Sequence, residues 1–294
     1  MHLRFFGLAY CGSHSDKQAV NALKAIDVHA HIFPPKIEHI ATDAIRDFYN
    51  RGSMRHSGSS EELLASGRPA GVVKYLVFTT ATTPHQVTVI HDFIMGEARK
   101  HPEFIPVGTM HKDFEDKAAE LDRIYDMGMR GIKLHPDFQK FCIDDDKMMP
   151  VFEHLQKKGM FVITHSGDYR YDFSHPARVA RIAKLFPEMP LIAAHFGGWS
   201  QWDIARELLV LPNVYVDTSS TFGFGGVEPV IQGLRTFDPT HIFFGDDFPM
   251  WDHAEEIRRL REVVTDDAFL EDILYNNFMA FFSRYGASAA GAEK

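Results

Sequence analysis

The chain has 294 residues, of which 45% are hydrophobic and 24% are charged, and its formal net charge is −9. This composition is typical of a soluble globular protein with a large core, and the length fits one α/β barrel or two ordinary domains. The acidic balance argues against nucleic acid as a partner, because contacts to phosphates require a basic surface. No apolar run is as long as a membrane span. The only cysteines are Cys11 and Cys142, so we expect a cytoplasmic protein without a disulfide framework.

The chain starts with MHLRFFGLAYC, which resembles a secretion signal only in part. Its apolar core is short, and Tyr10 is an unfavourable residue for a cleavage site. We interpret residues 1–23 as an N-terminal extension and residues 1–294 as a single domain.

From residue 24 onward, short apolar and β-branched runs alternate with amphipathic stretches of helical period. Eight runs predict strands, at residues 25–33, 71–80, 104–110, 129–136, 160–167, 190–197, 213–220 and 241–247. The stretches that predict helices are 113–128, 146–159, 175–187, 200–212, 225–238, 252–264 and 267–286. Eight strand-then-helix units with nearly apolar strands indicate a closed parallel (β/α)8 TIM barrel. A doubly wound sheet is the alternative, but it usually has fewer strands and often a glycine-rich phosphate turn, which is missing here.

One connection, residues 34–70, is much longer than the others and is rich in glycine, serine and charge. A loop of this length in a compact domain is usually functional or mobile. Two interpretations stay open for this insertion after the first strand: a lid over an active site, or a surface excursion without a catalytic role.

Polar side chains collect at the carboxyl ends of the predicted strands, where barrel enzymes carry their active sites. In strand order these residues are His29 and His31, Lys133 and His135, His165, His195, Asp217, and Asp246 followed by Asp247. Because side chains alternate along a strand, Asp27, His29 and His31 are expected on one face. Imidazoles and a carboxylate that meet at one point form the ligand set of a catalytic zinc or similar divalent ion.

These residues and their order resemble the amidohydrolase-2 group of the amidohydrolase superfamily, which includes amino-carboxymuconate-semialdehyde decarboxylase. The resemblance covers residues 25–282 and rests on D-V-H-A-H, G-I-K-L-H-P, T-H-S-G, A-H-F-G-G, F-G-D-D-F-P and the segment YNNFMAFF. It implies one divalent metal ion, held by His29, His31, His165 and Asp246. It also implies that Asp246 moves protons and that His195 is a catalytic base or electrostatic group rather than a ligand.

Lys133 leaves an alternative open. In dihydroorotase-like relatives a lysine at this strand is carboxylated and bridges two metal ions, in which case His195 becomes a ligand. Otherwise Lys133 is a structural ammonium or binds a substrate anion. Asp27 is expected to hold a neighbouring side chain in place.

The resemblance implies an enzyme, and two reactions fit the residues. In the first, metal-activated water attacks a small carbonyl substrate such as an amide, lactone or ester. In the second, a carboxy-lyase removes carbon dioxide from an unsaturated or aromatic acid, which requires a cation and a flat apolar slot. Weaker candidates for that pocket are His111, His135, Arg170, Trp199, Phe222 and Trp251. A ligand-binding barrel without catalysis is the third hypothesis.

We expect zinc as the metal, with manganese or iron as alternatives, and a small-molecule substrate as the partner. Neither nucleic acid nor a membrane is expected, and a homodimer is compatible with the sequence.

Overall fold

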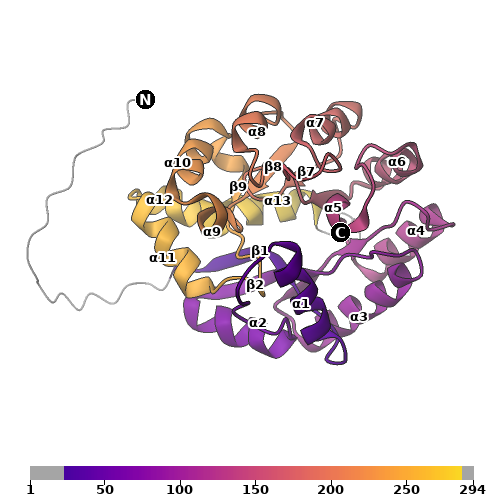
Figure 1. The fold of residues 1–294 in the computed structure, drawn as a ribbon, viewed down its shortest axis with the longest axis horizontal. Helices are drawn as coiled ribbons and strands as arrows, with labels where there is room; N and C mark the ends of the chain where they lie inside the picture. The colour runs from indigo at the N-terminus through magenta and orange to yellow at the C-terminus, as the bar shows by residue number, and fades with distance from the viewer. Residues whose placement is uncertain (1–22, 287–294) are drawn as a thin grey trace, which may run out of the picture.

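The computed structural model describes residues 23–286, so all but one residue of the predicted N-terminal extension, and Cys11 with it, lie outside the described part. Strands lie at the centre of the molecule and helices surround them (Figure 1). The strands are β1 (Ala25–His31), β2 (Val72–Phe78), β3 (Phe104–Pro106), β4 (Gly108–Thr109), β5 (Gly131–Leu134), β6 (Phe161–Thr164), β7 (Leu191–Ala193), β8 (Val214–Asp217) and β9 (Ile242–Phe243). Each falls within a predicted run, and neighbouring strands pair in parallel.

The ring of strands is closed at both places where regular pairing stops. Val107 lies between β3 and β4 in one continuous run of chain, and its amide donates to the carbonyl of Val77 at 3.1 Å. Between β9 and β1, the amide of Val28 donates to Phe244 at 3.0 Å and the amide of Asp247 donates to His29 at 2.9 Å. The β3–β4 pair therefore acts as one strand, and the predicted eight-stranded barrel is confirmed.

The helices around the barrel alternate with the strands. They are α1 (Glu38–Phe48), α2 (Ser60–Gly67), α3 (Gln86–Lys100), α4 (Lys117–Met127), α5 (Pro136–Gln139), α6 (Met149–Lys158), α7 (Pro176–Leu185), α8 (Trp202–Leu208), α9 (Thr221–Gly225), α10 (Val227–Thr236), α11 (His253–Val263), α12 (Asp267–Glu271) and α13 (Asn277–Tyr285), with a π-helical turn at Asp272–Asn276. Helix α4 illustrates how the sequence sets their ends. The side chain of Asp116 accepts from the amide of Ala119 at its start, and Gly128, with φ of 108°, ends it.

The long connection after β1 is not a structureless loop, because it contains α1 and α2. Its glycine and serine residues lie mainly between these helices and at the start of α2. There the side chain of Ser59 caps the helix by accepting a hydrogen bond from the amide of Glu62. Helix α1 lies next to the carboxyl ends of the strands, where Ile45 and the following Tyr49 reach the site described below.

The amino-terminal half of the barrel interior is a separate apolar cluster. Its members from the strands include Ile26, Val28, Phe161 and Phe243, and helix α13 adds Phe278 and Phe281 to it. The rings of Phe243 and Phe278 meet edge to face, with centroids 5.5 Å apart. Helix α13 thus closes this end of the barrel with apolar side chains, and the buried histidines lie toward the other end.

A bulge in β1 changes which residues face the interior. Asp27 pairs with Tyr75 and Ala30 with Val77, so three steps along β1 match two along β2. Before the bulge, Ile26 and Val28 belong to the interior cluster. After it, the imidazoles of His29 and His31 both lie against the interior ring of Phe78. The expectation that Asp27 shares their face is therefore wrong, because the extra residue reverses the alternation.

Candidate metal centre

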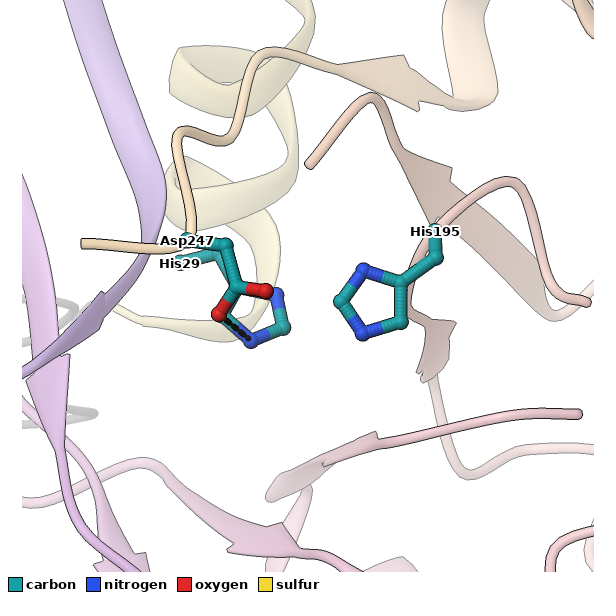
Figure 2. A group of neighbouring side chains, drawn as sticks. All are labelled: His29, His195 and Asp247. Atoms are coloured by element: carbon teal, nitrogen blue, oxygen red, sulfur yellow. Dashed lines mark ion pairs between the residues drawn. The ribbon is translucent and has the colours of Figure 1, made fainter. Parts of the chain in front are cut away.

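Three side chains from different parts of the barrel converge above the apolar layer. One ligand atom from each of His29, His195 and Asp247 lies within 4.8 Å of the other two, and all three residues are buried. Figure 2 shows the imidazole of His195 facing the pair formed by His29 and Asp247 across a gap. His29 comes from β1, His195 follows β7 and Asp247 follows β9. A set of two imidazoles and one carboxylate fits a divalent transition metal.

Hydrogen bonds behind the two imidazoles fix their orientation. The Nδ1 of His29 lies 3.0 Å from the carboxylate of Asp217, and the Nδ1 of His195 lies 3.0 Å from the carbonyl of Ser219. Both acceptors require an N–H at Nδ1, which leaves a lone pair on each Nε2. A carboxylate or carbonyl behind the distal nitrogen is the usual support of a metal-binding histidine.

Burial keeps these imidazoles neutral. It lowers the pKa of His29 well below its usual value, with further lowering by Lys133 and His195. It also lowers the pKa of His195 to about 4, although Asp217 opposes the shift. Neutral imidazoles with free lone pairs are the form that binds a metal ion.

Two of the three converging residues have an unusual backbone conformation. His195 has φ of 61° and Asp247 has φ of 68°, and Phe196 beside His195 also lies in the left-handed region, at 49°. Residues other than glycine rarely adopt this region, and such residues cluster at functional sites. The turn after β7 is held by the amide of His195, which donates to Asp217 at 3.0 Å. Backbone strain therefore coincides with the convergent side chains.

His31 and His165, both predicted as ligands, border this group. The Nε2 of His31 lies 3.7 Å from Asp247, and the Nδ1 of His165 lies 3.1 Å from the Nε2 of His195. The Nε2 of His165 is buried, and no described residue forms a hydrogen bond with it. Each of these two imidazoles therefore contacts one member of the three-residue group without belonging to it.

The structure places Asp247, rather than the predicted Asp246, beside the histidines. The alternation from Phe243, which faces the interior, turns Asp247 inward and Asp246 outward. The Asp246 carboxylate lies 3.8 Å from the Nδ1 of His253 and forms no hydrogen bond with a described residue. Gly245 allows this turn to approach β1, because a Cβ there would lie 3.0 Å from the Cβ of His29.

Asp27 supports the site from outside the ring. It accepts from the amide of His29 at 2.9 Å, from the amide of Asp246 at 3.0 Å and from the Nε2 of His253 at 3.1 Å. Burial would lower the pKa of His253, but the nearby Asp246 and Asp27 outweigh it and raise that pKa to about 9. Asp27 thus joins β1 to the segment that carries Asp247, and His253 is a supporting residue that sequence reasoning missed.

Lys133 projects into the same space as the histidines. Its Nζ lies 2.9 Å from the Nε2 of His29 and 4.9 Å from the centre of the Phe78 ring. Burial lowers its pKa to about 8, although Asp217 and Asp247 oppose the shift. An ammonium hydrogen-bonded to this nitrogen occupies the lone pair that a metal ion would use, so metal binding to His29 requires Lys133 to give up the contact.

The weaker pocket candidates separate into two groups. His135 lines the site, where its Nε2 lies 2.9 Å from the hydroxyl of Tyr49, a residue that the sequence analysis did not single out. Trp199 packs against Tyr49, with ring centroids 5.2 Å apart. The indole of Trp251 donates to Ser220 at 2.9 Å.

Of the six candidates only His135 lines the site cavity, and Phe222, His111 and Arg170 have other roles. Phe222 belongs to the hydrophobic core, and His111 accepts from the amide of Asp113 beside its own strand end. The guanidinium of Arg170 donates twice to Asp168, at 2.9 and 2.7 Å, and once to the carbonyl of Phe48, at 2.6 Å. Arg170 therefore ties the end of α1 to the barrel and is not placed to bind a substrate anion.

The cavity between the site residues is small. It offers about 10 Å³, which is room for about one water. Its lining residues are His29, His31, Ile45, Tyr49, His135, Phe138, His195, Asp247, Pro249 and Met250. Polar groups thus surround a single water-sized space, and Ile45 and Tyr49 cover it.

Residues 26–284 match the family model Amidohydro_2, described as amidohydrolase. The chain belongs to the amidohydrolase family. The match includes every strand of the barrel except the first residue of β1, and it confirms the predicted resemblance. No curated protein sequence matches this amidohydrolase.

Solved structures with the same fold cover almost the whole amidohydrolase domain. A 5-carboxyvanillate decarboxylase from Novosphingobium aromaticivorans, in complex with manganese, has 16% identity and a TM-score of 0.70, and the match covers 90% of this chain and 97% of that one. An uncharacterised TIM-barrel protein from Bordetella bronchiseptica has 19% identity and a TM-score of 0.69, over 90% and 100% of the two chains. A protein assigned as a 2-pyrone-4,6-dicarboxylic acid hydrolase from Pseudomonas putida has 16% identity and a TM-score of 0.64, over 89% and 98%.

These identities establish the fold and leave the reaction open. Among the described residues of this amidohydrolase, no helix has the length and apolar character needed to cross a lipid bilayer.

Proposed function

We propose that the chain is a metal-dependent hydrolase that acts on a small carbonyl substrate such as an amide, lactone or ester. The observation that carries the proposal is the convergence of His29, His195 and Asp247 around a water-sized cavity. We assign the metal to these three residues, with His31 and His165 as the neighbouring nitrogens able to complete the set. Asp247 replaces Asp246 as the proposed carboxylate ligand, because it is the one that faces the histidines.

A divalent ion held there would supply a Lewis acid that lowers the pKa of water and polarises a carbonyl oxygen. Asp247 would accept the proton of the attacking water and return it to the leaving group. Burial raises the pKa of this carboxyl to about 7, although the hydroxyl of Ser220 donates to it and opposes the shift. Ser220 holds one oxygen of this carboxylate, and the other lies 3.4 Å from the Nε2 of His29 and faces the site.

Ile45 and Tyr49 cover the cavity, which supports a reaction from which bulk water is excluded. The hydroxyl of Tyr49 contacts His135, and burial raises the pKa of Tyr49 well above its usual value, so the phenol stays protonated. A protonated phenol at the rim is a hydrogen-bond donor for a substrate oxygen.

The proposal is tested by metal analysis together with a substrate panel. We expect about one divalent ion per chain, and metal-dependent turnover of a panel of esters, lactones and amides. Carbon dioxide release from aromatic and enol acids, without turnover of the esters, lactones and amides, would show that the chain is a decarboxylase and not a hydrolase. A chain that takes up no zinc or manganese would support the non-catalytic barrel.

The decarboxylase is kept as the second candidate because of Arg51. Its guanidinium lies 4.0 Å from the centre of the Trp251 ring, and its buried Nε forms no hydrogen bond with a described residue. A cation against a flat indole is the combination that an unsaturated or aromatic acid requires. The solved relatives that are decarboxylases support this candidate to the same degree as the assigned pyrone hydrolase supports the first.

His195 has a test of its own. We expect His195→Asn to lose the metal, because one of its ring nitrogens belongs to the convergent group, whereas the resemblance implies a catalytic base that is not a ligand. Metal retained in His195→Asn and lost in His165→Asn would assign the ligand role to His165 and the base role to His195. Zinc as the metal, a homodimer and a cytoplasmic location stay predictions.

A further inference from the structure

A second, larger cavity adjoins the metal centre. It is a groove of about 460 Å³ between helices α1 and α3, called here the α1–α3 groove. Helix α1 contributes Ile37, at the residue just before its start, and Ile40, and α3 contributes Val89, Ile90 and Phe93. A volume of this size matches that of small-molecule binding sites.

Within residues 23–286, no other part of the chain covers the apolar face of α1. Ile37, Ile40, Ala41, Ala44 and Ile45 follow the spacing of one helix face, and all five line the groove. The side chain at Ile40 is 70% exposed, and Val89 across the groove is 65% exposed. An amphipathic helix normally buries this face against the core, so the exposed stripe needs an occupant.

The groove and the metal centre share a wall. His31, Ile45 and Phe138 line both cavities, so one layer of side chains separates them. Ile45 and Phe138 are only half-buried, and side chains of this kind change rotamer readily. His31 is also the groove-lining residue that touches Asp247, at 3.7 Å.

The side chains that line the α1–α3 groove indicate which class of molecule it can bind. The described residues that line the groove include no lysine, arginine, aspartate or glutamate, and the polar ones are three threonines, one glutamine and His31. The hydroxyl of Thr80 is buried without a hydrogen-bond partner among the described residues. A hydrocarbon chain or alkyl-substituted ring fits such a lining, whereas a charged peptide or nucleotide does not.

We propose that the α1–α3 groove binds the apolar tail of the substrate, while the carbonyl head of the same molecule reaches the metal centre past His31. This inference rests on the proposed function, and it specifies the substrate class as a carbonyl compound with an alkyl or alkyl-aryl tail. Ile45 and Phe138 form the gate between head and tail.

The test uses n-alkylphosphonates with two, four, six and eight carbons as probes, titrated by calorimetry into the full-length, manganese-loaded protein. The phosphonate replaces the carbonyl head at the metal centre. We expect the dissociation constant to fall about fourfold with each added methylene until the groove is filled.

Ala44→Trp fills the groove with an indole from an exposed position on α1. It should abolish the dependence on chain length, so that hexyl- and octylphosphonate bind no more tightly than ethylphosphonate. The matched control is His39→Trp, which places the same side chain on the solvent face of the same helix. This control should keep the full dependence on chain length.

The two proposals fail in different ways. If no phosphonate binds, even the shortest, the metal centre itself is wrong. If all four bind equally to the wild-type chain, the metal centre stands and the groove has another occupant, which overturns the inference. A change from dimer to monomer in Ala44→Trp but not in His39→Trp, measured by light scattering, would assign the groove to contact between two copies and would overturn it as well.

Discussion

The two ends of the barrel interior are filled by opposite kinds of side chain. At the amino-terminal end, phenylalanines from β6, β9 and α13 interlock in an apolar cluster. At the carboxyl end, His29, Lys133, His195 and Asp247 share a space with room for about one water. Burying ionisable groups costs free energy unless they are paired, whereas burying aromatic rings stabilises the fold. The comparison indicates that the apolar end stabilises the fold, whereas the polar end lowers its stability in order to hold the functional groups.

Asp247→Asn is the strongest test of the polar end. The amide keeps the shape of the side chain but neither carries the charge nor accepts a proton, so turnover should fall about 10³-fold on any substrate that the panel identifies. Metal content, measured by mass spectrometry, should fall as well. Asp246→Asn is the matched control, because it makes the same change one residue away on the outer face, and it should retain the metal. The reverse result would restore Asp246 as the ligand.

Phe278→Ala is the corresponding test of the apolar end. Phe278 is 1% exposed and packs edge to face on Phe243. Its truncation should lower the free energy of unfolding by about 3 to 5 kcal/mol, as measured by urea denaturation. The metal content of the folded fraction should not change. A large loss of metal from the fully folded variant would show that the two ends of the barrel are coupled. It would contradict the assignment of stability to one end and metal binding to the other.

The pH dependence of stability tests the link through His253. Because its pKa is raised to about 9, protonated His253 stabilises the fold below its unfolded pKa of about 6.5. This contribution should be lost as the pH rises from about 6.5 through 9. The difference in unfolding free energy between wild type and His253→Gln should shrink by about 1 to 3 kcal/mol over that window. A difference that grows with pH would contradict the assigned charge.

Lys133→Met is expected to have the smallest effect, and it tests whether the lysine competes with the metal ion for His29. Removing an ammonium from the Nε2 of His29 frees that lone pair, so metal affinity should rise about tenfold. Calorimetric titration with manganese measures the change. A fall in affinity, or in the number of bound ions from two to one, would instead support the carboxylated lysine of the two-metal alternative.

The sequence predicted the barrel well because its signals are local. Each strand lies within a predicted apolar run, and the predicted helices at residues 113–128 and 175–187 contain α4 and α7. The histidines of the site were also found, since their placement at strand ends follows from the order of elements alone.

What the sequence left unresolved depends on contacts between distant segments. Strict alternation placed Asp27 with His29, and only the pairing of β1 with β2 reveals the bulge that separates them. Two consecutive aspartates cannot both face inward, but the choice of Asp247 depends on how β9 joins β1. Arg170 looked free to bind a substrate anion until its contacts with Asp168 and Phe48 were known. Helices α1 and α3 were missed, and the groove between them with it.

The bulge in β1 also sets a rule for engineering this barrel. On a strand without the bulge, Asp27, His29 and His31 would share one face, so the histidines could not face the interior while Asp27 faces outward. A graft of D-V-H-A-H onto a regular strand would therefore either bring an additional carboxylate into the interior beside the two histidines or turn both histidines outward. The transferable unit is the five residues together with their irregular hydrogen-bond register, and a library that varies β1 should hold its length fixed.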